Sequence, residues 1–167
     1  ISKNLVTQTF GVFDLPEGRN LLSLGSEVAF ETENFVDNNN IRESLVESAK
    51  KFINVPYLWG GRSYFGIECS ALLQLVYKIH GIVLPRDADK QAELGEARDF
   101  VEESEPGDLA FFEDETGFIS HVGLVLSPFE LIHASGKVRI DSLDFSGIYN
   151  AEKNKHTHKL RMVKTVI

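Results

Sequence analysis

The feature that most restricts the fold of this chain is a change in the spacing of its apolar residues, from every three or four positions to every second position or short runs. Between residues 41 and 53, and again from about Cys69 to His80, apolar side chains recur every three or four positions. That spacing places them on one face of a helix. After residue 106 the apolar residues stand in short runs or alternate, which is typical of strands. Two helices followed by antiparallel strands predict a domain of the α+β class.

The boundaries of further elements follow from capping residues and turns. Asn40 can cap the first helix, and Glu43 lies in its first turn. A short third helix is predicted over residues 87–97. The predicted strands of the second half cover residues 109–112, 122–126, 131–134 and 160–167.

The first 36 residues have a different pattern. Short apolar runs alternate there with turn sequences such as Pro16-Glu17-Gly18. This alternation predicts three or four short β-strands. Residues 37–40 then form a linker or the start of the first helix.

Charge and the apolar runs restrict the partners of the chain. It has a formal net charge of −8 and a sequence pI of about 5.1. An acidic surface repels polyanions, so nucleic acid is not an expected partner. No apolar run approaches the roughly 18–20 residues of a membrane span, and the start at Ile1 does not resemble a signal peptide. We expect a monomeric mature protein or fragment without an integral membrane segment, and its compartment stays open.

Cys69 is the single cysteine, which rules out an intrachain disulfide. A lone cysteine is more often a small core residue than a nucleophile. Its place at the start of the second predicted helix favours the nucleophile, because the unpaired amides there stabilise a thiolate. We therefore expect a lowered pKa for this thiol, opposed slightly by the neighbouring Glu68.

A nucleophilic cysteine needs a base, and the chain has five histidines. His80 lies about eleven rises of 1.5 Å along the helix from the cysteine and cannot reach it. It is interpreted as a partner of the helix dipole at the C-terminal end. His156 and His158 lie in a polar stretch and are expected at the surface.

His121 and His133 lie on two consecutive predicted strands. If the loop comprises residues 127–129, Leu126 faces Glu130 and the two histidines are diagonal neighbours on one face. A loop with an even number of residues would place them on opposite faces. Each could instead be a hydrogen-bonded structural residue. The chain has no CxxC or HxxxH spacing, no P-loop and no dinucleotide-binding glycine pattern, so we expect no metal and no cofactor.

Several ordered motifs resemble the NlpC/P60 family of papain-like cysteine peptidases, over roughly residues 41–167. They are Tyr57-Leu58-Trp59-Gly60-Gly61, Gly66-Ile67-Glu68-Cys69-Ser70-Ala71, Leu84-Pro85-Arg86-Asp87-Ala88-Asp89-Lys90-Gln91, Pro106-Gly107-Asp108-Leu109, His121-Val122-Gly123 and Ile132-His133-Ala134-Ser135. Motifs in the expected order are more specific than any one of them alone. Two departures are mild, since Glu68 stands where the family usually has Asp and Ala71 where it has Gly.

The resemblance implies roles for four residues. Cys69 is the nucleophile, His121 is its base, and His133 orients that base. Tyr57 and the backbone amide of Cys69 bind the oxyanion. Ordinary packing is the alternative for Tyr57, and core or pocket packing is the favoured interpretation for Trp59, which otherwise contributes to substrate binding.

Within the family the chain is most similar to γ-D-glutamyl-L-diamino acid endopeptidases, which release L-Ala-γ-D-Glu from peptidoglycan stem peptides. The resemblance implies that Asp87 binds the free amine of L-Ala, with Glu68 and Ser70 lining the same pocket. Ala88 falls where relatives often carry Ser. Asp87 could instead form a salt bridge with Arg86 or cap a helix.

Residues 1–36 resemble the last part of a bacterial SH3-like domain, which in relatives narrows the substrate cleft. The expected division is therefore a partial SH3-like β domain, 1–38, and a papain-like catalytic domain, 39–167. The implied function is cleavage of L-Ala-γ-D-Glu-diamino acid peptides in cell-wall peptide turnover or recycling. Two alternatives stay open: a general peptidoglycan endopeptidase or amidase acting on polymer, and a catalytically silent wall-binding module.

Overall fold

The computed structural model describes residues 4–32 and 39–167. Its first part contains two antiparallel strand pairs. Strand β1 (Asn4–Leu5) pairs with β4 (Glu27–Val28), and β2 (Phe10–Leu15) pairs with β3 (Gly18–Ser23). These four strands confirm the prediction of three or four. Residues 37 and 38 of the predicted linker lie outside the described residues.

The two long helices lie where the apolar stripes predict them. They are α1 (Ile41–Lys50) and α2 (Cys69–Ile79). The N–H of Glu43 donates to the Asn40 side chain at 3.5 Å, which is the predicted cap. The two helices pack together through buried Leu, Val and Ala side chains. His80 follows the last turn of α2, and its Nε2 hydrogen-bonds to the Ser48 hydroxyl of α1 at 2.9 Å.

The third helix, α3 (Ala88–Gln91), is shorter than the predicted 87–97. The chain turns at Gly95, where φ is +66° and a Cβ would lie 2.0 Å from the Thr165 carbonyl oxygen. Strand β7 (Glu96–Ala97) then pairs with the last strand of the chain. The helical prediction beyond residue 91 is wrong because this pairing extends the backbone.

The second half forms one antiparallel sheet. Its long strands are β8 (Leu109–Glu113), β9 (Ile119–Ser127), β10 (Glu130–Ser135), β11 (Lys137–Asp144), β12 (Gly147–Asn150) and β13 (Lys155–Thr165). The order is β12-β11-β10-β9-β8-β13-β7, and β12 also pairs with β13, so six strands close into a barrel. The predicted strands correspond to β8, β9, β10 and β13. The sequence patterns missed β11, β12 and residues 155–159 of β13.

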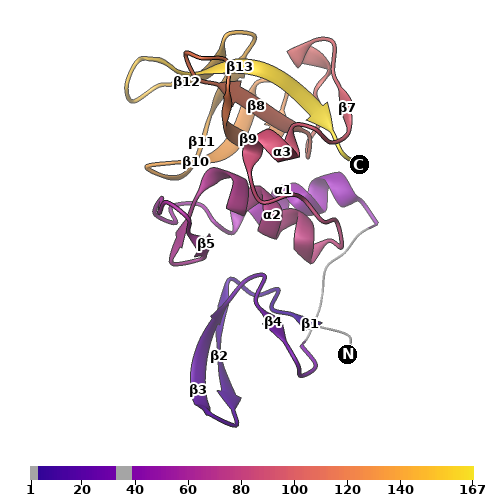
Figure 1. Ribbon diagram of the computed structural model, residues 1–167, viewed down its shortest axis with the longest axis vertical. Helices are drawn as coiled ribbons and strands as arrows, with labels where there is room; N and C mark the ends of the chain where they lie inside the picture. The colour runs from indigo at the N-terminus through magenta and orange to yellow at the C-terminus, as the bar shows by residue number, and fades with distance from the viewer. Residues whose placement is uncertain (1–3, 33–38) are drawn as a thin grey trace.

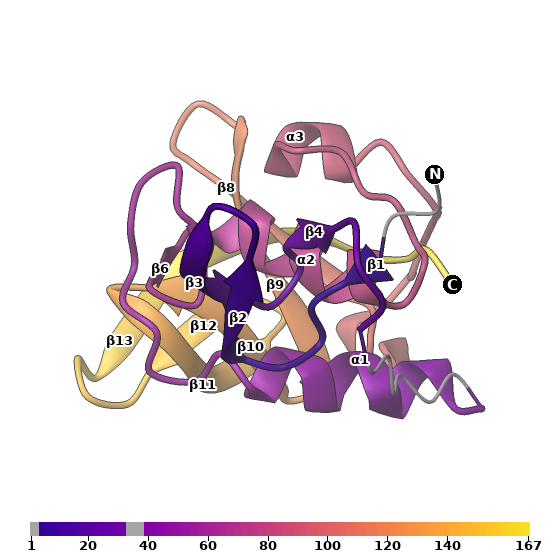
Figure 2. The same cartoon turned by 90° about the horizontal axis from the view of Figure 1, so that it is seen from below.

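The molecule has three layers (Figure 1). Helices α1 and α2 form the middle layer, with the barrel on one side and β1–β4 on the other. The view from below looks along the stacking direction, with β2 and β3 in front (Figure 2). One core joins all three, because Leu24, Leu72 and Phe111 belong to a single buried cluster. Short elements complete the fold, namely β5 (Arg62–Ser63), β6 (Gly66–Ile67) and a 3₁₀ turn, Val101–Glu103.

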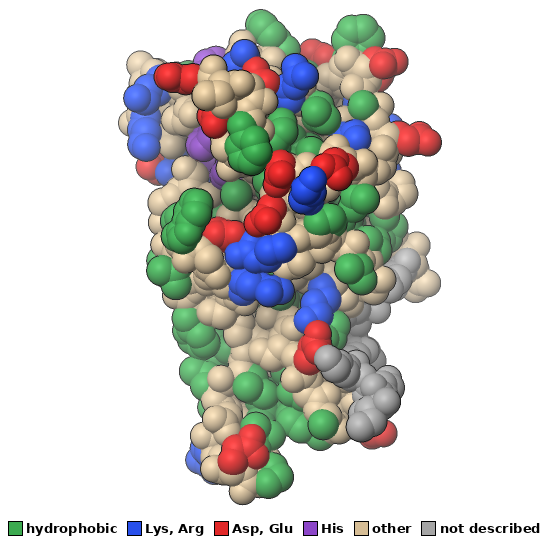
Figure 3. Space-filling model, viewed as in Figure 1, with side chains coloured by type: hydrophobic (Ala, Val, Ile, Leu, Met, Phe, Trp, Pro, Cys, Tyr) green, Lys and Arg blue, Asp and Glu red, His purple; other side chains and the backbone are tan. Residues whose placement is uncertain are grey.

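The N-terminal strands are attached to the helix layer by specific contacts. Lys78 of α2 forms an ion pair with Glu27 at 2.8 Å, and the N–H of Tyr64 donates to the Ser23 hydroxyl at 2.9 Å. Figure 3 shows many hydrophobic side chains over the part of the molecule that holds these strands. The hairpin β2–β3 thus exposes Phe10, which is 48% accessible, although its ring also lies against Tyr64.

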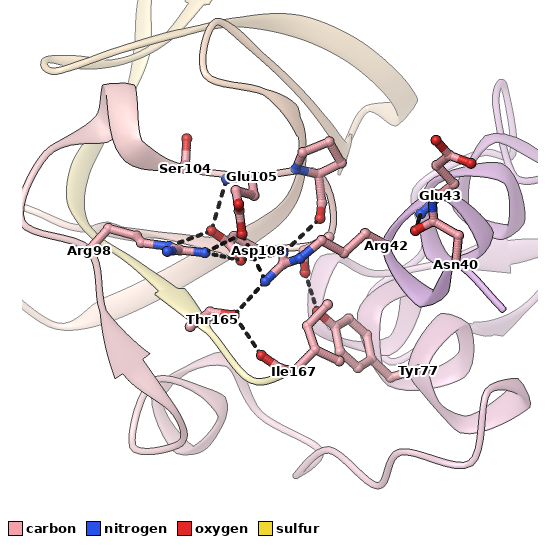
Figure 4. A network of polar contacts seen from close by, with 12 residues as sticks. Asn40, Arg42, Glu43, Tyr77, Arg98, Ser104, Glu105, Asp108, Thr165 and Ile167 are labelled. Carbon is pink, nitrogen blue, oxygen red and sulfur yellow. Dashed lines mark hydrogen bonds and ion pairs between the residues drawn. The ribbon is translucent and has the colours of Figure 1, made fainter. Parts of the chain in front are cut away.

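A buried charge network joins α1 to the sheet (Figure 4). Asp108, whose side chain is fully buried, accepts from Arg42 at 2.9 Å and from Arg98 at 2.8 Å. Arg42 also donates to the Pro106 carbonyl and to the Thr165 hydroxyl. Burial pushes the pKa of Asp108 upward, but the hydrogen bonds from the two arginines outweigh it and hold the pKa below its usual value.

None of the helices in the described ranges combines the length and the apolar character that crossing a bilayer requires.

Candidate active site

Cys69 occupies the first position of α2, directly after β6. Its side chain is buried, with 8% of the residue accessible, and it faces β9 across the interface between helix and sheet. The backbone N–H groups of Val122 and Ser70 donate hydrogen bonds to the sulfur. The thiol therefore lies beside the residue that follows His121 in the chain.

The predicted lowering of the Cys69 pKa is wrong. Burial raises the pKa of this thiol, and the charge of Glu68 adds to the rise, while the amides of Val122 and Ser70 oppose it. Removing the charged form from water outweighs the partial charges of the helix terminus here. The resting site consequently contains a neutral thiol, which must give up its proton during reaction rather than before it.

His121 and His133 meet on one side of the sheet. Nε2 of His121 and Nδ1 of His133 are 2.8 Å apart, and both residues are buried. Burial, followed by the neighbouring imidazoles, lowers the pKa of His121 well below its usual value. His121 is therefore a neutral imidazole near pH 7, which is the form that can accept a proton.

The register at the histidines is the predicted one, because Leu131 pairs with Val125 and Ile132 with Leu124, but the hairpin end differs from the prediction. Glu130 pairs with Ser127 rather than with Leu126, so the loop has two residues. A loop with an even number of residues, without any other irregularity, would place the two imidazoles on opposite faces of the sheet. The register shifts between Glu130 and Leu131, and Leu131 then pairs with Val125. This β-bulge adds the odd residue and returns both imidazoles to one face.

Asp141 of β11 extends the chain of contacts and was not predicted. Its Oδ2 lies 2.8 Å from Nε2 of His133 and accepts from Nε of Arg139 at 2.7 Å. Burial raises the pKa of Asp141, but hydrogen bonds from His133 and Arg139 more than compensate and keep the carboxylate ionised. The sequence held no usable signal, because β11 itself was not recognised as a strand.

The carboxylate decides which nitrogens carry protons. Asp141 can only accept, so Nε2 of His133 carries a hydrogen and its Nδ1 is a lone pair. Nε2–H of His121 then donates to that lone pair. Nδ1 of His121 is left unprotonated and is the nitrogen available to a thiol. A buried carboxylate thus sets the tautomers of two imidazoles in series.

His158 was expected at the surface but lies in the site. Its ring stacks on His121 with centroids 4.2 Å apart and planes 25° apart, and it is half-buried. Burial, with a smaller effect of His133, lowers the pKa of His158 to about 4. The error has a simple cause: the polar stretch belongs to β13, where His158 pairs with Ile148. His156 is exposed, as expected, and contacts Asp144 at 2.8 Å.

A cleft of about 450 Å³ opens beside the sulfur. It brings together residues that lie far apart in the chain: Tyr57, Trp59, Glu68, Cys69, Ser70, Asp87, Ala88, Asp89, Phe118, Ile119 and Ser120. All the residues predicted to bind substrate line it. Trp59 is 85% accessible and therefore belongs to the rim rather than to the core. The lining contains no residue from positions 4–32, so the described N-terminal strands do not narrow this cleft.

Two of the predicted substrate-binding residues already have partners. Arg86 donates to Glu68 and, at 3.1 Å, to the Ser70 hydroxyl, while the N–H of Gly60 donates to Glu68 at 2.7 Å. The alternative pairing of Arg86 with Asp87 is thus replaced by one with Glu68. Asp87 precedes α3 without a side-chain cap hydrogen bond and is exposed at the cleft.

Tyr57 lies near the thiol at the edge of the cleft. Burial raises the pKa of its hydroxyl, and the charges of Cys69 and Glu68 contribute. The phenol therefore keeps its proton and can donate it to a developing oxyanion. A helix-start thiol and a phenol donor line one cleft, and a neutral imidazole precedes the Val122 amide that points at the sulfur. These are the types of group that a papain-like cysteine peptidase requires.

Comparison with known proteins agrees with this class. The model of the NlpC/P60 family matches residues 54–161, which is more than half of the chain, and the chain belongs to this family. A Bacillus cereus protein named gamma-D-glutamyl-L-lysine dipeptidyl-peptidase is 37% identical over 94 residues. That match covers 55% of this chain and 28% of the relative, so the chain corresponds to only part of such proteins.

Solved structures repeat the fold. The crystal structure of an NlpC/P60 family protein from Bacillus cereus has a TM-score of 0.68 at 26% identity, covering 98% of this chain and 53% of that one. A Mycobacterium tuberculosis protein described as a non-catalytic NlpC/p60 domain adapted to peptidoglycan binding has a TM-score of 0.60 at 21% identity, covering 77% and 99%. The second likeness concerns the fold alone.

Proposed function

We propose that this chain is a cysteine peptidase that hydrolyses the bond between γ-D-glutamate and a diamino acid in peptidoglycan stem peptides. The observation that carries the proposal is the hydrogen-bonded series from Asp141 through His133 to His121, whose neighbour in the chain, Val122, directs its backbone N–H at the Cys69 sulfur. A silent binding module has no use for a buried base held in one tautomer.

The reaction proceeds through a thioester. Cys69 attacks the γ-carbonyl of D-Glu while Nδ1 of His121 takes the thiol proton. The oxyanion accepts hydrogen bonds from the Tyr57 hydroxyl and the Cys69 amide, each worth about 3 kcal/mol of barrier. His121 then protonates the leaving amine. Water, deprotonated by the same nitrogen, hydrolyses the thioester and releases L-Ala-γ-D-Glu.

Substrate selection rests on the carboxylates of the cleft. Glu68 is neutralised by Arg86, so Asp87 and Asp89 are the acids that remain to bind an ammonium group. We assign Asp87 to the free amine of L-Ala, since an amine paired with a carboxylate at the cleft favours an unblocked N-terminus. Ala88 removes the hydroxyl that relatives often carry there. The name of the Bacillus cereus relative, gamma-D-glutamyl-L-lysine dipeptidyl-peptidase, supports this bond type.

A peptide pair tests both parts of the proposal. L-Ala-γ-D-Glu-L-Lys and L-Ala-γ-D-Glu-diaminopimelate should be cleaved, and their N-acetylated forms should be cleaved at least tenfold more slowly. Cys69→Ala should abolish turnover, and Asp87→Asn should remove the preference for the free amine. Turnover that persists in Cys69→Ala would reject the peptidase, whereas equal cleavage of free and acetylated peptides would reject only the role of Asp87.

We further propose that residues 1–38 are part of an SH3-like β domain and that 39–167 form the catalytic domain. The four strands in two antiparallel pairs and their packing on α2 support this division. Limited proteolysis tests it: cleavage between residues 32 and 39 should leave a folded, active fragment that begins near residue 39.

A further inference from the structure

Three imidazoles converge behind the thiol, and the peptidase mechanism uses only two of them. His121, His133 and His158 each present one ring nitrogen, and these nitrogens lie within 4.8 Å of one another. They come from β9, β10 and β13, three strands of the barrel that are rigidly paired through their neighbours. Three histidine nitrogens on a rigid frame are the ligand set of many zinc sites.

The hydrogen bonds around the cluster decide which nitrogens can bind an ion. Nδ1 of His158 contacts the Thr157 hydroxyl at 2.9 Å, which leaves Nε2 free. Nε2 of His133 is held by Asp141, so its Nδ1 is the donor atom toward the cluster. An imidazole whose second nitrogen is fixed by a carboxylate is the usual outer support of a metal-binding histidine.

The cluster can be reached without passing through the substrate cleft. His158 lines a separate cavity of about 650 Å³ together with Glu113, Asp114 and Glu115. Ser120 lines both this cavity and the catalytic cleft, so the two are neighbours on either side of one backbone segment. Although Glu113 is paired with Lys159, the cavity offers acidic side chains at its mouth to a cation.

We propose that His121, His133 and His158 form an inhibitory site for a divalent transition metal such as Zn²⁺. Nε2 of His121, Nδ1 of His133 and Nε2 of His158 are the ligands, with water in the fourth position. Tetrahedral ligands on zinc lie about 3.3 Å apart, so the 2.8 Å contact between His121 and His133 must open slightly and the His158 ring must turn inward.

The bound metal would inhibit peptide cleavage because it changes which nitrogen of His121 carries the proton. Coordination requires a lone pair on Nε2 of His121, which in the free site carries the hydrogen donated to His133. That proton moves through water to Nδ1, and the imidazole stays neutral in the opposite tautomer. Nδ1 then carries a hydrogen instead of a lone pair and cannot accept the thiol proton. The last step rests on the proposed role of His121 as base, but binding itself does not.

Calorimetry with Zn²⁺ and Co²⁺ spectroscopy on the Cys69→Ala variant test the site without activity and without the thiol. One ion should bind per chain, and Cys69→Ala/His158→Phe should bind at least tenfold more weakly, since phenylalanine keeps the stack but offers no ligand. Cys69→Ala/His156→Phe is the matched control and should bind as Cys69→Ala does. His158→Gln serves as a second variant if the phenylalanine protein does not fold.

Turnover of the free peptide provides the second measurement. Zn²⁺ should inhibit the chain with its native thiol, EDTA should reverse the inhibition, and His158→Phe should raise the inhibitory concentration at least tenfold. Absence of binding to Cys69→Ala, or equal inhibition of the native chain and His158→Phe, would overturn the proposal and assign the metal to Cys69 and His121. A chain that binds Zn²⁺ but cleaves no peptide would instead reject the proposed function and keep the site.

Discussion

Asp108 and Asp141 are both buried, and both accept hydrogen bonds from arginine, but their networks end differently. Asp108 is shared between Arg42 and Arg98, two cations that keep their charge at every physiological pH. Asp141 is shared between Arg139 and His133, and His133 passes the interaction on to His121. The Asp108 network contains only groups with fixed charge, whereas the Asp141 network ends at Nδ1 of His121, which has an unused lone pair.

The comparison shows what turns a buried carboxylate from a structural contact into a catalytic support. Both aspartates have lowered pKa values because hydrogen bonds outweigh burial. The difference lies in the partner: arginine cannot exchange a proton, whereas imidazole can change its tautomer or charge. We therefore expect the Asp108 network to affect stability alone and the Asp141 network to affect mainly turnover.

Of the substitutions considered, Asp108→Asn should have the largest effect, and this effect should be on the stability of the fold. Replacing the acid removes the buried counter-charge of two partly buried guanidinium groups and leaves them only the exposed Glu105, which costs about 3 kcal/mol of unfolding free energy and roughly 10 °C in Tm. Thermal and urea unfolding measure it. The folded variant should keep kcat/KM within twofold. Glu105→Gln, on an exposed residue of the same network, is the control and should cost far less.

Asp141→Asn should lower kcat by about 100-fold, or ~2.7 kcal/mol, with KM little changed, because the amide cannot enforce the tautomers or stabilise the imidazolium. Steady-state kinetics on the free peptide measure it. The matched control is Asp144→Asn, whose partner His156 lies at the same 2.8 Å but is exposed. Equal kinetics for the two variants would contradict the proposed series.

Arg139→Gln should have a smaller effect of the same kind. Asp141 keeps its contact with His133 but loses a charged donor worth about 1.5 kcal/mol, so kcat should fall roughly tenfold. Arg98→Gln is the counterpart in the other network and should lower Tm while leaving kcat unchanged. A loss of stability without loss of turnover in Arg139→Gln would show that the arginine supports the fold and not the base.

The dependence of kcat/KM on pH should distinguish a buried catalytic histidine, as in this site, from an exposed one. Because the pKa of His121 is lowered by burial, the imidazole stays unprotonated as the pH falls below 6.5. The sign follows directly: activity is present above the lowered pKa and is lost only as the pH falls through it. The acid limb of kcat/KM should therefore be centred below pH 6.5, and a midpoint at or above 6.5 would contradict a neutral buried base.

Local patterns were sufficient for the two long helices and for the reactive groups. The apolar period located α1 and α2. Ordered motifs singled out Cys69, His121 and His133, and the structure brings these residues together at one interface between helix and sheet. These features depend on neighbours within a few positions, which a sequence displays directly.

The pKa of Cys69, the bulge between β9 and β10, and the positions of Asp141 and His158 were decided by the tertiary structure. Each depends on groups that the folded chain brings together. Burial sets the pKa of the thiol, a bulge keeps the two histidines on one face, and the pairing of β13 with β12 places His158 beside His121. The sequence by itself determined which groups are able to react. Burial and strand pairing, which involve residues far apart in the chain, decided their protonation and their partners.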